Sequence, residues 1–137
     1  MKKGRIINLC IIIMLVSFIW GQSCMSREES AGESGWIFEN VINPVQEAVF
    51  GREVISHEGI RKCAHAFEFM CLAIAMTAYV GTLVKSQALC MMIAFLDETI
   101  QIFSGRGPSI IDVWIDSGGA LIGVLAVVIF IRVFRRK

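Results

Sequence analysis

Residues 110–134 have the sequence IIDVWIDSGGALIGVLAVVIFIRVF, the longest apolar run in the chain. A helix needs about 20 mainly apolar residues to cross the hydrocarbon core of a bilayer, so this run is long enough to span a membrane. Three further apolar runs precede it, at residues 6–21, 63–84 and 88–103, and two of these are short enough to require local thinning of the bilayer. The four runs predict an all-α membrane protein, a four-transmembrane-helix bundle formed by residues 1–137 as a single domain.

The composition agrees with a protein that lies in a lipid bilayer. Hydrophobic residues make up 55% of the chain and charged residues 18%, against about 25% charged in an ordinary soluble domain. A net charge of only +1 gives no general basic surface, so the chain is not expected to bind nucleic acid. The five cysteines have no Cys-x-x-Cys or metal-ligand spacing and predict no disulfide framework.

The distribution of charge predicts the orientation of the four spans. All twelve acids lie between Glu28 and Asp116, whereas both chain ends are purely basic. Four spans would place eight of the thirteen bases on one side of the membrane without any acid, and the basic side is normally cytoplasmic. Both termini are therefore expected in the cytoplasm; the eight bases are Lys2, Lys3, Arg5, Lys85, Arg132, Arg135, Arg136 and Lys137. In an alternative interpretation, the first run is a signal peptide that is removed.

Residues 22–60 then form a loop on the outer side. Its first part, residues 26–34 (SREESAGES), is polar and is expected to be a flexible tether. Apolar residues recur near helical spacing from Trp36 to Val49, and Pro44 disfavours helix at Asn43, so two short helical pieces are expected. This amphipathic segment either lies on the outer leaflet or packs on the bundle as a lid.

Ionisable side chains interrupt the last three runs near their outer ends. Each costs about 2.5–3.5 kcal/mol on insertion scales, so such residues suggest function. A helix rises about 1.5 Å per residue, so the ionisable side chains of all three spans lie within roughly 10 Å of the outer surface. We therefore predict one outer polar cluster; its members in the spans are His65, Glu68, Asp97, Glu98, Gln101, Asp112 and Asp116.

The same spacing predicts how the last span packs. Asp112 and Asp116 share a helical face with Gly119 and Gly123. Two glycines four residues apart let another helix approach closely, so Gly119 and Gly123 are expected to form a helix-packing surface below the carboxylates.

The turn at residues 104–109 (SGRGPS) adds two candidate residues. Arg106 can meet the carboxylates or an anionic headgroup, because its planar fork matches carboxylate and phosphate. Ser109 can cap the following helix, with Asp112 three residues later, so capping is a second interpretation of Asp112.

Three stretches resemble motifs of VanZ-like membrane proteins. Residues 61–69 (RKCAHAFEF) resemble the family's Lys-x-x-His-x-x-Glu-Tyr, with Phe69 in place of the tyrosine. Residues 97–103 (DETIQIF), followed by Gly105-Arg106 and Ser109-x-x-Asp112, are similar to its Asp-Glu-x-x-Gln-x-Phe…Gly-Arg…Ser-x-x-Asp pattern, in a turn about one residue shorter. Residues 116–123 (DSGGALIG) resemble Asn/Asp-x-x-Gly-Ala-x-x-Gly, and the match covers about residues 55–125.

The resemblance implies a small multi-pass protein of the bacterial cell membrane, linked through the family's namesake to low-level resistance to the glycopeptide teicoplanin. It implies no defined biochemical activity. Three functions stay open: binding of an anionic lipid, cell-wall precursor or glycopeptide at the cluster, catalysis by a transferase or hydrolase, and a purely structural network. Catalysis would use His65 as general base, with Glu98 or Asp112 as acid or orienting group. The candidate ligand-binding residues are Arg61, Lys62, His65, Glu68, Asp97, Glu98, Gln101, Arg106, Ser109, Asp112 and Asp116.

The charge of the cluster raises the question of a cofactor. Three bases (Arg61, Lys62, Arg106) stand against five acids, which gives a net charge of −2 with His65 neutral. A partly desolvated site either protonates some carboxylates or binds a cation. Carboxylates alone suit Mg²⁺ or Ca²⁺, and His65 with carboxylates suits Zn²⁺. The spacing alone assigns no metal ligand and no cofactor.

Overall fold

The computed structural model describes residues 2–25, 32, 35–105 and 109–134, and the expected all-α architecture is confirmed for them. These residues form five helices of α type and one π-helical turn, and no strand occurs among them. The elements are α1 (Lys2–Cys24), the π-helix η1 (Phe38–Ile42), α3 (Asn43–Phe50), α4 (His57–Val80), α5 (Leu83–Phe103) and α6 (Ile110–Phe134).

Three helices, rather than the expected four, are long and apolar enough to cross a membrane within the described ranges. They span Lys3–Cys24, His57–Val80 and Ile110–Phe134, in α1, α4 and α6. The apolar run at 88–103 lies in α5, which is 21 residues long but carries Lys85, Asp97 and Glu98. By length and composition, three of the four expected spans are therefore found, and α5 does not qualify because its charged residues lower its mean hydropathy.

Local capping signals set the ends of α4. The helix begins six residues before the apolar run, since Ser56 Oγ accepts a hydrogen bond from the Gly59 N–H at 3.2 Å. It ends at Gly81, whose left-handed backbone (φ 74°) places its N–H 2.9 Å from the Thr77 carbonyl oxygen. Helix α5 starts two residues later, at Leu83.

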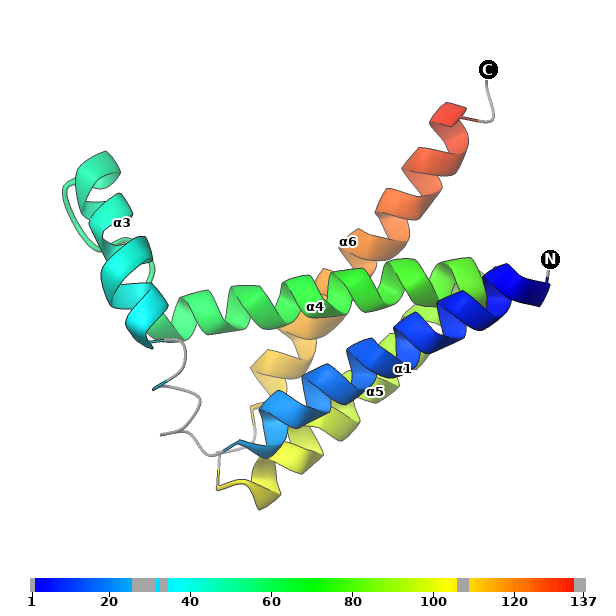
Figure 1. Ribbon diagram of the computed structural model, residues 1–137, viewed down its shortest axis with the longest axis horizontal. Coiled ribbons are helices and arrows are strands. Elements are labelled where there is room, and N and C mark those ends of the chain that lie inside the picture. Colours follow the sequence, from blue (N-terminus) through cyan, green and yellow to red (C-terminus); the bar gives the residue numbers. More distant parts are fainter. Residues whose placement is uncertain (1, 26–31, 33–34, 106–108, 135–137) are drawn as a thin grey trace.

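The segment before α4 forms one continuous helix instead of two separate pieces. The expected break at Asn43 does not occur, because this residue is helical (φ −63°, ψ −46°) and the π-helix η1 leads directly into α3. Pro44 follows η1 directly, at the start of α3, and the last N–H before it, that of Asn43, bonds to the Phe38 carbonyl oxygen five residues back. In Figure 1 this segment projects from the start of α4, away from the other helices.

The helix ends pair in a way that fixes the directions of α1, α4 and α5. The Arg5 guanidinium lies over the Tyr79 ring, 5.4 Å from its centroid, so the start of α1 is beside the end of α4. Ser104 Oγ donates to the Ser23 carbonyl oxygen at 2.8 Å, so α1 and α5 end together. Figure 1 shows α1 running alongside α5, and α6 crossing α4.

The closest helix approach joins α4 and α6 through two glycines. A Cβ atom on Gly119 would overlap the backbone carbonyl group of Ala66, and one on Gly123 would overlap the carbonyl oxygen of Met70. Ala120, on the same helix, is fully buried in a core that includes Phe69 of α4. The predicted glycine surface thus faces α4, directly beside the segment that carries His65.

Candidate functional site

His65 is at the centre of a group of polar side chains from three helices. Its Nδ1 lies 3.1 Å from Glu68 Oε2, one turn further along α4. Its Nε2 lies 2.9 Å from Asp97 Oδ2 on α5 and 4.0 Å from Asp116 Oδ2 on α6. Both ring nitrogens are therefore engaged by carboxylates, and the two long-range contacts tie α5 and α6 to α4.

The two aspartates are among the most deeply buried charged groups of the described residues. The exposed fraction is 0% for Asp97 and 3% for Asp116. Asp97 Oδ2 also accepts a hydrogen bond from Gln101 Nε2 at 3.0 Å, whereas Asp97 Oδ1 is buried without a partner. No hydrogen bond from the described residues reaches the Asp116 carboxylate. The group therefore holds unused acceptor capacity in a buried position.

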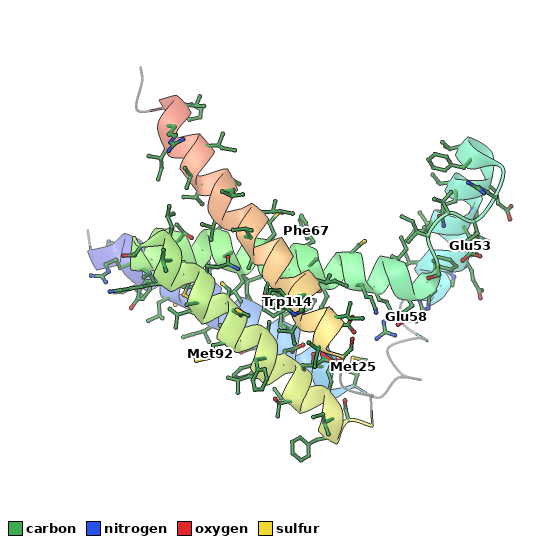
Figure 2. The ribbon with its side chains drawn as sticks, turned by 180° about the vertical axis from the view of Figure 1, so that it is seen from behind. Met25, Glu53, Glu58, Phe67, Met92 and Trp114 are labelled. Carbon is green, nitrogen blue, oxygen red and sulfur yellow. The ribbon has the colours of Figure 1, made fainter. Side chains whose placement is uncertain are left out.

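A second, more exposed ion pair lies beside this group. Lys62 Nζ is 2.9 Å from Asp112 Oδ1 and 3.4 Å from Glu58 Oε1. Lys62 is half-buried in the second turn of α4, while Asp112 is in the first turn of α6. Figure 2 shows Glu58 on the first turn of α4, toward the end of the helix that leads to η1 and α3. Lys62 thus connects the start of α4 to the start of α6.

Glu98 links the end of α5 to the start of α6. Its Oε1 accepts a hydrogen bond from the Ser109 N–H at 2.7 Å, and the side chain is largely buried. Ser109 Oγ in turn accepts from the Asp112 N–H at 3.3 Å, as expected for a residue that caps a helix. Glu98 therefore has a clear structural role in positioning the turn between the two helices.

The structure describes only one of the two remaining predicted cations. Arg106 lies outside the described residues. Arg61 is half-buried on α4, and no ion pair joins it to the cluster within the part of the chain that the structure describes. The nearest described base is accordingly Lys62, which two carboxylates already neutralise.

A pocket of about 370 Å³ lies between α5 and α6 next to Glu98. Its wall is apolar apart from Glu98, Thr99 and Ser109, with Phe95, Val113 and Trp114 among the lining residues. Figure 2 shows Trp114 on α6, close to where this helix crosses α4. The sequence patterns do not predict this pocket, because its wall depends on how α5 and α6 cross.

Two polar links between helices were also not predicted from the sequence. Gln87 Nε2 donates to the Ser117 carbonyl oxygen at 3.0 Å, which joins α5 to α6 below the His65 group. Ser104 joins α5 to the end of α1 through the Ser23 carbonyl oxygen. Short polar residues within an apolar run are a weak signal for such links, since they also occur without a partner helix.

The contacts of His65 bear on its predicted role as a general base. A general base needs a ring nitrogen within reach of the substrate proton, and here both nitrogens face carboxylates. The described residues that could hold a divalent ion are His65, Asp97 and Asp116, whose nearest ligand atoms all lie within 4.8 Å of one another.

Comparison with protein-family models matches the VanZ/LLP1 family over residues 7–131. Neither a curated protein nor a solved structure matches the chain. The matched range covers most of the chain and includes every residue of the polar cluster, so the resemblance in the three motifs is confirmed. With three helices long and apolar enough to cross a bilayer, this is a multi-pass membrane protein that belongs to the VanZ/LLP1 family.

Proposed function

We propose that this protein acts in the bacterial cell membrane by binding an envelope ligand at the outer polar cluster, and so contributes to glycopeptide resistance. The observation that carries the proposal is the buried group of His65, Asp97 and Asp116, drawn from three helices of an apolar protein. Ionisable residues in such positions are costly, so retaining several together favours a ligand site over a purely structural one.

The surroundings of the cluster favour an amphipathic ligand. The apolar pocket between α5 and α6 has Glu98 and Ser109 in its wall, and Glu98 adjoins Asp97 of the polar group along α5. A lipid or a lipid-linked cell-wall precursor has a polar headgroup joined to an acyl chain. The headgroup would suit the polar cluster, and the acyl chain would suit the apolar pocket. Arg61 and Arg106 are the bases proposed to meet an anionic headgroup, since Lys62 is already paired.

The proposal includes four membrane crossings, with α5 as the third. Its charged residues Asp97 and Glu98 are both buried against neighbouring helices, so they do not face lipid. The start of α1, the end of α4 and the start of α5 then lie on one side, which carries Arg5 and Lys85. We assign this basic side to the cytoplasm, together with both termini.

The projecting helix is proposed to lie on the outer leaflet. Trp36, Val45, Val49 and Phe50 are all more than half exposed, and the segment stands away from the bundle in Figure 1. An exposed apolar face of this kind is typical of interfacial helices, and it argues against a lid packed on the bundle.

Removing charge at the rim of the cluster should abolish resistance without removing the protein. We expect Glu98→Gln and Asp112→Asn each to abolish teicoplanin protection in a sensitive host, with unchanged membrane abundance. The amide oxygen introduced by Glu98→Gln can still accept from the Ser109 N–H, and the half-buried Lys62–Asp112 pair retains enough solvent contact to contribute only about 1 kcal/mol to stability. The measurements are the inhibitory concentration of teicoplanin and the amount of protein in isolated membranes.

Glu47→Gln, on the exposed surface of α3, is the matched control for loss of one acid and should retain protection. If protection falls only in step with membrane abundance, the cluster is structural and the proposed function is wrong.

The orientation predicts a pattern of thiol labelling in intact cells. Cys24 is exposed at the end of α1 and should react with a membrane-impermeant maleimide. Cys90 is a poor inner reference, because it is fully buried and would be protected on either side. Lys85→Cys, at an exposed position, combined with Cys24→Ser and Cys63→Ser, should react only after permeabilisation. Labelling of that cysteine in intact cells would contradict a cytoplasmic α4–α5 turn.

A further inference from the structure

We propose that His65, Asp97 and Asp116 form a binding site for one divalent transition-metal ion of the zinc type. The ligand atoms are His65 Nε2 and one carboxylate oxygen from each aspartate, and they come from α4, α5 and α6. An imidazole nitrogen favours Zn²⁺ and its neighbours in the transition series over Mg²⁺ or Ca²⁺, which prefer all-oxygen sites.

The distances fit such an ion. Tetrahedral coordination at about 2.1 Å from the metal separates neighbouring ligand atoms by about 3.4 Å. The separations from His65 Nε2 are 2.9 Å to Asp97 and 4.0 Å to Asp116, one on either side of that value. Three protein ligands also leave a fourth position for water or for a group of a bound ligand.

The unpaired carboxylate oxygens are the independent observation that points to a cation. Asp97 Oδ1 is buried without a hydrogen-bond partner, and Asp116, which is 3% exposed, has the 4.0 Å ion pair with His65 Nε2 as its contact in the group. Buried polar atoms are normally satisfied, and a buried carboxylate without a donor is expensive. A metal ion between the two aspartates would satisfy both of them.

Two further side chains contact the proposed ligands in the way that outer-shell residues of metal sites do. Glu68 Oε2 lies 3.1 Å from His65 Nδ1, so it can accept the Nδ1 proton and leave Nε2 to coordinate. Gln101 Nε2 donates to Asp97 Oδ2 and orients that carboxylate. Carboxylate–histidine–metal contacts of this kind fix the tautomer and the ring orientation.

A bound divalent ion would offset two negative charges of the cluster and let it accept an anionic group. This consequence rests on the proposed function, whereas the metal site itself does not. The metal site is tested on purified protein and the proposed function in cells, so the failure of one can be recognised separately from the failure of the other.

The experiment uses the full chain purified in detergent, stripped with a chelator and titrated with Zn²⁺ by calorimetry at pH 7. We expect saturable binding of one ion per chain, abolished by Asp116→Asn. Glu68→Gln, behind the histidine, should weaken binding by about 10- to 100-fold. Glu47→Gln removes one acid from the exposed surface of α3, outside the polar cluster, and this variant should bind as the wild type does.

Co²⁺ titration adds a readout of the ligands. The visible bands of a site with nitrogen and oxygen ligands are expected, without the near-ultraviolet band that thiolate ligands produce. The inference is overturned if folded wild-type protein binds no Zn²⁺ saturably, because the group is then a histidine–carboxylate ion-pair network only. It is equally overturned if binding survives Asp116→Asn, since the ion must then lie elsewhere, as at the cysteines. Should a variant fail to fold, the Co²⁺ spectrum of the wild type decides, because a thiolate band would place the ion at the cysteines and overturn the inference.

Discussion

We expect His65→Ala to lower the free energy of unfolding by about 3–5 kcal/mol in the presence of a chelator. The substitution leaves Glu68, Asp97 and Asp116 without the imidazole that lies within 4.0 Å of each of them. Removing one partner of a buried ion pair costs more than the pair itself contributes, because the remaining charge stays desolvated. The measurement is unfolding of purified protein in mixed micelles with an increasing fraction of denaturing detergent.

A double-mutant cycle with Asp97→Asn separates this effect from a loss of packing. Because Asp97 and His65 are in direct contact, the double variant should be less destabilised than the sum of the single variants, by about 1 kcal/mol or more. Additive effects would mean that His65 stabilises the fold through its volume and through its edge contact with Phe69, rather than through its charge.

Gly119→Ala is expected to destabilise the helix pair by about 1–3 kcal/mol, the usual range for overpacking a core. The added Cβ overlaps the backbone of Ala66, and backbone cannot rotate away as a flexible side chain can. Helices α4 and α6 must therefore separate, which also pulls Asp116 away from His65. Unfolding in mixed micelles measures the loss of stability, and the yield of monodisperse protein reports its consequence for folding.

Gly118→Ala is the matched control, since it makes the same change one residue earlier on the same helix. A Cβ at Gly118 meets no atom within 4 Å, so this variant should equal the wild type or gain up to about 1 kcal/mol from better helix propensity. If both variants behave alike, the close approach of α4 and α6 does not contribute to stability.

The sequence was most informative where side-chain chemistry and helical period act together. The positions of His65, Glu68, Asp97 and Asp116 within apolar runs predicted that three helices bring polar groups to one level, and these four side chains lie together in the structure. The packing surface at Gly119 and Gly123 could also be predicted, because two glycines on one helix face allow close approach of another helix.

The sequence was least informative where an outcome depends on several helices at once. Three apolar helices were found instead of four because Lys85, Asp97 and Glu98 lower the mean hydropathy of α5. Hydropathy along one helix does not describe how Asp97 and Glu98 are buried against neighbouring helices. The role of Glu98 as the acceptor for Ser109 depends on the turn between two helices. The helix through Asn43 required a π-helical turn before Pro44, for which no short pattern exists.

The hydrogen bond from Ser109 to Glu98 has a consequence for how the protein is made. Helix α5 leaves the ribosome before residue 109 does, so for a time its glutamate has no N–H group from the following turn. His65 on α4 is already synthesised and can pair with Asp97, but the hydrogen bond of Glu98 can form only after the turn before α6 has been synthesised. In the proposed topology with α5 as the third crossing, the last two helices are thus expected to enter the lipid as a hairpin, with α5 held at the insertion machinery until α6 is synthesised.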